Sequence, residues 1–199
     1  MQKFWKVTDM KLKVLVDNHT LIDQYFCGEP AVCYDIEDGG RHILFDTGYS
    51  DLFLQNARKC GVDMDTVSAV VLSHGHNDHT GGLPSLLEEY RGAGLTVLAH
   101  PNAFDCRMEE NEWIGSPLSA KQVRQKCRLQ LSAAPVRLTE RLTFLGEIPE
   151  SNHFETRRPI GKRREGNQMV DDFVPDDTGL VYQSEEGLYL ITGCSHSGI

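Results

Sequence analysis

Apolar and polar residues alternate along the opening of the chain in a pattern typical of β-strands. Residues 11–16, Lys-Leu-Lys-Val-Leu-Val, begin with alternating polar and apolar positions and predict a strand. Residues 31–36 predict a second strand, and the turn signal Asp38-Gly39-Gly40 joins it to a third at residues 42–45. The chain therefore begins with predicted strands, two of them in a hairpin.

The middle of the chain predicts helices between buried strands. Ser50 suits the N-cap of a helix over residues 51–60, and Gly61 suits the left-handed position after its end. A second, short helix is predicted at residues 83–90. Two buried strands are predicted in the same region, at residues 69–72 and 95–99.

The second half of the chain has a weaker pattern. Charges interrupt the apolar stripe of residues 105–112 and 119–130, for which helices are still the prediction. Residues 151–172 are polar and predict a long loop. That segment holds five arginines and lysines: Arg157, Arg158, Lys162, Arg163 and Arg164. Three strands are predicted in this half, at residues 142–145, 179–183 and 188–192.

Hairpins separated by isolated helices indicate an α+β fold or a layered α/β/β/α fold, with reactive side chains on loops at one sheet edge. The 199 residues predict a single domain over 1–199. A hydrophobic content of 40% and a charged content of 25% are ordinary for a soluble globular protein. The net charge of −9 argues against a nucleic-acid partner, because phosphates require a basic surface.

Two further features indicate the compartment. The first residues lack the apolar core of a signal peptide, and no run approaches the ~18 apolar residues of a membrane span. The six cysteines are scattered and form no C-x-x-C pair, so we expect reduced thiols. A cytoplasmic protein with no membrane partner is the resulting expectation.

The most informative segment is residues 72–82, Leu-Ser-His-Gly-His-Asn-Asp-His-Thr-Gly-Gly, which follows the predicted strand at 69–72. In extended chain, residues two apart project to the same side, so His74 and His76 can converge. A following turn can bring Asp78 and His79 close to them. Imidazole nitrogens and carboxylate oxygens bind zinc, manganese or iron, and two such ions form a hydrolytic centre that activates a water molecule.

This H-x-H-x-D-H motif after an apolar strand resembles the signature of the metallo-β-lactamase superfamily. Residues 42–48, His-Ile-Leu-Phe-Asp-Thr-Gly, resemble the strand and Asp-x-Gly element of that family. Residues 188–196 resemble its later strand, which carries another histidine. The resemblance covers residues 11–199 and implies a four-layer αβ/βα sandwich.

The resemblance also implies a metal centre with up to two divalent ions, zinc first and manganese or iron as alternatives. The implied ligands are His74, His76 and His196 for the first ion, and Asp78 and His79 for the second. Asp78 is the catalytic candidate, because a carboxylate there could also hold a leaving-group proton, although we assign it as a ligand first. Asp46 is implied as the acceptor beneath the metal loop that orients ligand histidines.

Residues 73–83, 146–149 and 192–199 resemble one branch of the superfamily, that of the dihydropterin-6-yl-methyl-(ribofuranosyl)aminobenzene 5′-phosphate synthases. The resemblance implies a metal-dependent hydrolase of a small molecule, with a pterin or a phosphorylated compound as substrate. Transferase or synthase activity on a dihydropterin is the related possibility.

One departure from the family pattern keeps other functions open. The family completes its second metal site with an acidic residue and a histidine beyond the position of His196, and only three residues follow His196 here. We therefore expect a C-terminally incomplete sequence, without the last strands and helix. The alternative is an inactive or mononuclear metal-binding fragment that uses His74, His76 and His196. A di-iron reductase core is disfavoured. That branch usually has glutamate in place of one loop histidine, whereas this chain has His76.

The remaining polar residues have weaker interpretations. Asp17, Asn18 and His19 suit a pocket mouth or an ordinary turn, and both interpretations stay open. Asp176 and Asp177 are interpreted as solvated turn residues, and Cys194 as a small packed residue. The basic residues 157–164 are interpreted as a solvated loop, with an anionic substrate as the alternative. No motif assigns a role to three other histidines: His42, His100 and His153. No substrate-binding residue is identified.

Overall fold

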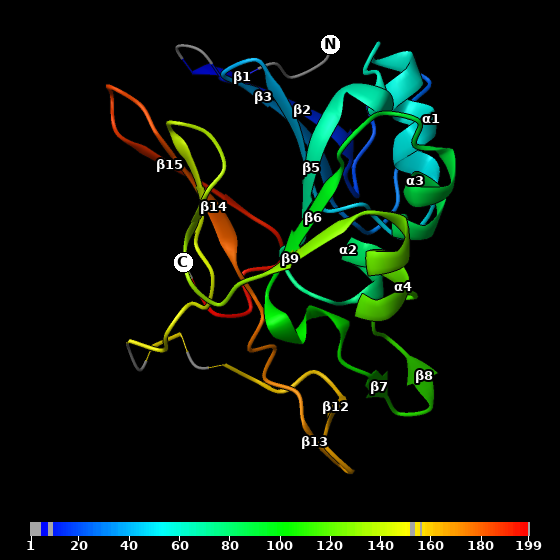
Figure 1. The fold of residues 1–199 in the computed structure, drawn as a ribbon, viewed down its shortest axis with the longest axis vertical. Coiled ribbons are helices and arrows are strands. Elements are labelled where there is room, and N and C mark those ends of the chain that lie inside the picture. The colour runs from blue at the N-terminus through cyan, green and yellow to red at the C-terminus, as the bar shows by residue number, and fades with distance from the viewer. Residues whose placement is uncertain (1–4, 8–9, 152–153, 156, 199) are drawn as a thin grey trace.

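The computed structural model describes residues 5–7, 10–151, 154–155 and 157–198, and the strands among them form three sheets. The largest sheet has the order β1-β2-β3-β4-β5-β6-β9 (Figure 1). Its strands are β1 (Trp5–Val7), β2 (Met10–Val16), β3 (Cys33–Asp38), β4 (Arg41–Phe45), β5 (Val67–Val71), β6 (Thr96–Ala99) and β9 (Arg128–Leu131). The first four strands pair antiparallel, whereas β4, β5, β6 and β9 pair parallel. The predicted opening strands are confirmed.

Three helices cover one face of this sheet, and a second sheet covers the other (Figure 1). The helices are α1 (Leu52–Lys59), α3 (Leu83–Glu89) and α4 (Ala120–Lys126). The second sheet is antiparallel and consists of β10 (Val136–Arg137), β11 (Leu142–Phe144), β14 (Gly179–Gln183) and β15 (Leu188–Thr192). This α+β sandwich confirms the expected fold class. A helical layer on the outer face of the second sheet is not seen among the described residues.

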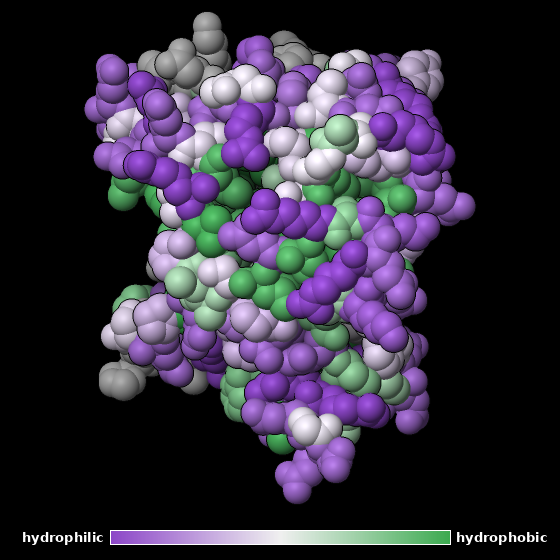
Figure 2. All heavy atoms as spheres, in the orientation of Figure 1, coloured by the Kyte–Doolittle hydropathy of each residue, from purple (hydrophilic) through white to green (hydrophobic). Residues whose placement is uncertain are grey.

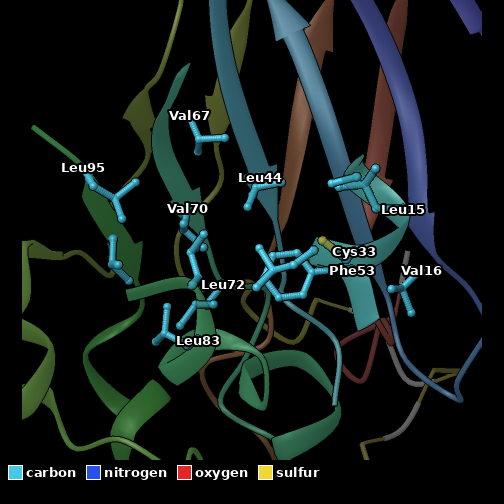
Figure 3. Packing of buried hydrophobic residues seen from close by; sticks show 14 of the residues in the cluster. Leu15, Val16, Cys33, Leu44, Phe53, Val67, Val70, Leu72, Leu83 and Leu95 are labelled. Carbon is cyan, nitrogen blue, oxygen red and sulfur yellow. The ribbon is translucent and has the colours of Figure 1, made fainter. Parts of the chain in front are cut away.

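The alternation of side chains along the central strands builds two separate cores. Leu44, Val70 and Leu72 point toward the helices and pack with Phe53 and Leu83 (Figure 3). The intervening residues point the other way and pack against the second sheet. That second core contains Ile43, Phe45, Ala69, Val71, Phe144, Leu180 and Tyr182. Figure 2 shows polar residues around the rim of one face of the molecule, with apolar groups toward its middle.

A third, small sheet corrects two predictions. Residues 105–112 are not a helix but contain β7 (Arg107–Glu109) and the start of β8 (Glu112–Trp113). The segment 151–172 is not a plain loop, because it contains the hairpin of β12 (Lys162–Glu165) and β13 (Gln168–Asp171). These strands pair in the order β13-β12-β7-β8.

Charge pairing explains why these segments were misread. Arg107 interrupts an apolar stripe in the sequence, yet its side chain is fully buried between two aspartates. In the hairpin, Lys162 pairs across the strands with Asp171 at 3.0 Å, so its charges stabilise β-structure instead of a solvated loop.

Two further boundaries differ from prediction. The helix α1 begins one residue later than expected, with Asp51 at the N-cap, while the Ser50 hydroxyl accepts a hydrogen bond from Leu52 N–H. The predicted helix at 119–130 ends at Lys126, and its last residues form β9. No helix among the described residues is long and apolar enough to cross a membrane.

Candidate metal centre

The parallel strands β4 and β5 end side by side, so the loops after them meet at one sheet edge. Asp46 follows β4, and residues 73–76 follow β5 and lead into the short helix α2 (Asn77–Thr80). The loop passes so close to the next loop that a Cβ at Gly75 would overlap the Ala103 carbonyl oxygen. Glycine is therefore required at this position in the histidine motif.

Three histidines face one another at this edge. His74 is fully buried, and its Nε2 lies 3.1 Å from Nδ1 of His76. The His196 ring, on the turn after β15, lies 4.8 Å from the His74 ring and 5.4 Å from the His76 ring between centroids. Ser73 Oγ lies 3.0 Å from His74 Nδ1, which leaves Nε2 turned toward the other rings.

A second group lies directly beside the first. His79 Nε2 is 3.2 Å from Asp78 Oδ2 and 3.1 Å from Cys194 Sγ. The His74 and His79 rings are 4.2 Å apart, so the two groups are contiguous. The structure thus brings together all five residues that the sequence proposed as ligands.

Asp46 lies beneath both groups, fully buried, as the sequence suggested. Its Oδ1 accepts the Ser73 N–H at 2.7 Å, and its Oδ2 accepts the Ser73 hydroxyl at 2.6 Å. The same Oδ2 lies 2.7 Å from His79 Nδ1, a position that holds a proton on Nδ1 and turns Nε2 toward Asp78 and Cys194. Asp46 has a φ of +61°, which an aspartate tolerates better than most residues.

These donors fit a divalent metal. Three groups have ligand atoms within 4.8 Å of one another: His74 with His76 and Asp78, His74 with Cys194 and His196, and Asp78 with His79 and Cys194. The Nε2 atoms of His76 and His196 are buried and have no hydrogen-bond partner among the described residues. Imidazole, carboxylate and thiol in one cluster are a donor set that suits zinc.

Electrostatics divide the histidines into two kinds. Burial lowers the pKa of His74 well below its usual value and lowers the pKa of His76 to about 4, so both rings are neutral near pH 7. Burial acts on His79 in the same sense, but the Asp46 charge and hydrogen bond raise its pKa well above the usual value. Burial acts to raise the pKa of Asp78, but the hydrogen bond from His79 and the charges of His79 and His76 together lower it below its usual value. Asp78 is therefore an ionised donor at neutral pH.

Cys194 contradicts its interpretation as a small packed residue. Its side chain is exposed on one side and contacts His79 on the other. Burial alone would raise the pKa of the thiol, but hydrogen bonds with His196 and His79 lower it. The sequence placed Cys194 near a ligand histidine, yet only the folded turn reveals which atoms it faces.

A buried ion-pair network supports the metal loop and was not predicted. The Asp176 carboxylate accepts the Gly75 N–H at 2.8 Å and pairs with Arg107, whose Nε lies 2.8 Å from Asp172 Oδ2. Asp172 Oδ2 in turn lies 4.0 Å from His76 Nε2. All three side chains of the network are fully buried.

Asp176 and Asp177 are therefore not the solvated turn residues that the sequence suggested. Asp176 holds the metal loop, and Asp177 accepts the Ser197 N–H at 2.8 Å beside His196. In the sequence, the signal for this role was the position of both aspartates before β14, because that strand leads back to the site.

Other weakly assigned residues lie elsewhere. Asp17 and His19 line a separate cavity of about 150 Å³ between β2 and α1 that contains none of the candidate ligands. Within the basic segment, Arg157 donates to the Ile148 carbonyl, and Arg163 lies 3.6 Å from Asp105. His153 lies outside the described residues.

Comparisons with known proteins point to one family. The family model of the metallo-beta-lactamase superfamily matches residues 28–199. A 7,8-dihydropterin-6-methyl-4-(beta-D-ribofuranosyl)-aminobenzene-5′-phosphate synthase from Methanocaldococcus jannaschii is 31% identical, across 98% of this chain and 70% of that protein.

Solved structures give the same result. A metal-dependent hydrolase of the β-lactamase superfamily superposes with a TM-score of 0.75 and 29% identity, across 95% of this chain and 67% of that one. A quorum-quenching N-acyl homoserine lactone lactonase, with a TM-score of 0.50 and 14% identity over 79% of this chain and 58% of that one, shares the fold. The chain belongs to the metallo-β-lactamase superfamily.

Proposed function

We propose that this chain carries the metal centre of a metal-dependent hydrolase that acts on a small-molecule substrate. The observation that carries the proposal is the convergence of His74, His76, Asp78, His79 and His196 at one sheet edge. Family membership and the similarity to a solved metal-dependent hydrolase support it. Zinc is the ion that we propose first.

In this proposal His74, His76 and His196 hold one ion, and Asp78 and His79 begin the site of a second. A divalent ion held there supplies Lewis acidity, which activates water and polarises a carbonyl or phosphoryl group. Asp46 keeps the His79 proton on Nδ1, and Ser73 positions the His74 ring. Asp78, with 24% of its side chain exposed, also reaches solvent.

The proposal predicts that a His76→Ala variant loses hydrolysis together with metal. The assay measures zinc-loaded protein with p-nitrophenyl acetate and with bis(p-nitrophenyl) phosphate. Loss of the metal should raise the activation free energy by several kcal/mol and so lower kcat/KM at least ~100-fold. His19→Ala, which changes an exposed histidine outside the cluster, should keep the wild-type rate. Equal rates in His76→Ala and wild type would contradict the proposal.

A second candidate function follows from the relative in Methanocaldococcus jannaschii. Its name describes a synthase of a pterin-containing phosphate, so a dihydropterin is a candidate substrate for this chain as well. Synthase turnover of a dihydropterin and the aminobenzene ribose phosphate, without ester hydrolysis, would favour this function over the first. The basic residues Arg157 and Arg163 are already engaged by other groups, so they give no separate support to an anionic substrate.

A further inference from the structure

Cys194 belongs to two of the three candidate groups of metal ligands. It lies with His74 and His196 in one group and with Asp78 and His79 in another. Apart from Cys194, these two groups have no residue in common. The thiol therefore lies between the donors of the first ion and the donors of the second.

The backbone holds Cys194 firmly in this position. The residue lies on the turn after β15, where Ser195 has a φ of +57° and Gly198 N–H donates to the Ser195 carbonyl at 3.0 Å. The next residues are tied to the segment that leads into β14, because Ser197 N–H donates to Asp177 at 2.8 Å. Two residues before His196, the turn thus presents the thiol toward His79 Nε2 at 3.1 Å.

Packing does not account for the placement of this thiol. Cys194 is exposed and absent from both hydrophobic cores, so burial of its side chain contributes little to stability. Its sulfur lies within 4.8 Å of imidazole and carboxylate atoms of the two candidate groups to which it belongs. His196, which shares a candidate group with Cys194, has a buried Nε2 with no hydrogen-bond partner among the described residues. Its ring lies 5.4 Å from the ring of His76, whose side chain is 8% exposed and whose Nε2 also has no such partner.

We propose that the Cys194 thiolate is a metal ligand of this centre, placed to serve both ion positions. This inference rests on the proposed metal centre and adds a sulfur donor to it. A thiolate ligand favours zinc, cobalt and cadmium over magnesium and manganese, which prefer oxygen donors. The centre is thereby selective for thiophilic ions.

Cobalt(II) tests this proposal without any enzyme assay. The metal-free protein is titrated with cobalt(II), and its absorption spectrum is recorded in the visible and near-ultraviolet ranges. Wild type should show visible ligand-field bands from bound cobalt together with a near-ultraviolet thiolate-to-cobalt charge-transfer band. Cys194→Ser should keep visible bands and lose the charge-transfer band, and Cys194→Ala should do the same.

The matched control is Cys27→Ser, which changes another exposed cysteine that belongs to none of the candidate groups and lines the separate cavity between β2 and α1. It should keep the charge-transfer band of wild type. Zinc affinity should fall by at least ~10-fold in Cys194→Ser, while manganese affinity changes little. Far-ultraviolet circular dichroism of each variant checks that the fold is retained.

The outcomes separate this inference from the proposed function. Wild-type protein that binds cobalt with ligand-field bands but no charge-transfer band would overturn the role of Cys194 and leave the histidine site intact. A charge-transfer band that survives in Cys194→Ser and Cys194→Ala would overturn it equally. Wild-type protein that binds no cobalt at all would overturn both proposals.

Discussion

At the scale of single residues, the chemistry of the site depends on how a few polar atoms are oriented. Asp46 accepts hydrogen bonds from Ser73 and His79, so one carboxylate sets the direction of the metal loop and the tautomer of a candidate ligand. The sequence predicted this role from the Asp-x-Gly pattern. It could not predict the role of Cys194, because the contact with His79 joins residues 115 apart in the chain.

Asp46→Asn tests the orientation of His79 directly. An asparagine fits the same shape and the positive φ, but its amide would place an N–H against His79 Nδ1. His79 would then carry its proton on Nε2, and this nitrogen would lose the lone pair that binds a metal ion. We expect a ~10- to 100-fold loss of zinc affinity, measured by competition with a chromophoric chelator.

Asp35→Asn is the matched control. Asp35 is also a buried aspartate beside a histidine, with its Oδ1 3.1 Å from His42 Nδ1, but this pair lies outside the candidate groups. Zinc affinity should stay at the wild-type value in this variant. An equal loss of affinity in both variants would show that the effect of Asp46 is general destabilisation.

At the scale of elements, strands could be predicted where apolar residues alternate regularly. The prediction failed where charged side chains pair with one another in the folded protein. The strands β14 and β15 were predicted at their observed bounds, because the pattern there is regular. The small sheet of β7, β8, β12 and β13 was missed, since its charged residues pair within the protein. Arg107 and Asp176 are 69 residues apart, and no local pattern connects them.

Arg107→Met is predicted to destabilise the protein strongly. The change leaves Asp172 and Asp176 buried without their counter-charge, which typically costs about 3–5 kcal/mol. Urea unfolding of the metal-free protein measures the loss. Arg58→Met removes an exposed pair with Glu89 and should change the unfolding free energy by less than ~1 kcal/mol. Equal stabilities of the two variants would refute the structural role of Arg107.

At the scale of the whole molecule, the seven-stranded sheet divides the fold into two cores and brings the loops of β4 and β5 to one edge. The turn after β15 reaches the same edge from the second sheet and adds His196. The overall sandwich and the residues that converge at the candidate site were predictable, because the family motifs lie on these loops. The supporting network was not, because it arises only when distant segments pack together.

The central claim is that this edge binds a divalent metal through the histidine cluster. Its most direct test is the zinc content of the purified protein after zinc loading and removal of free metal, measured by inductively coupled plasma mass spectrometry. We predict between about one and two zinc ions per chain for wild type and for His19→Ala, and a clearly lower content for His76→Ala. Equal zinc content in wild type and His76→Ala would contradict the account.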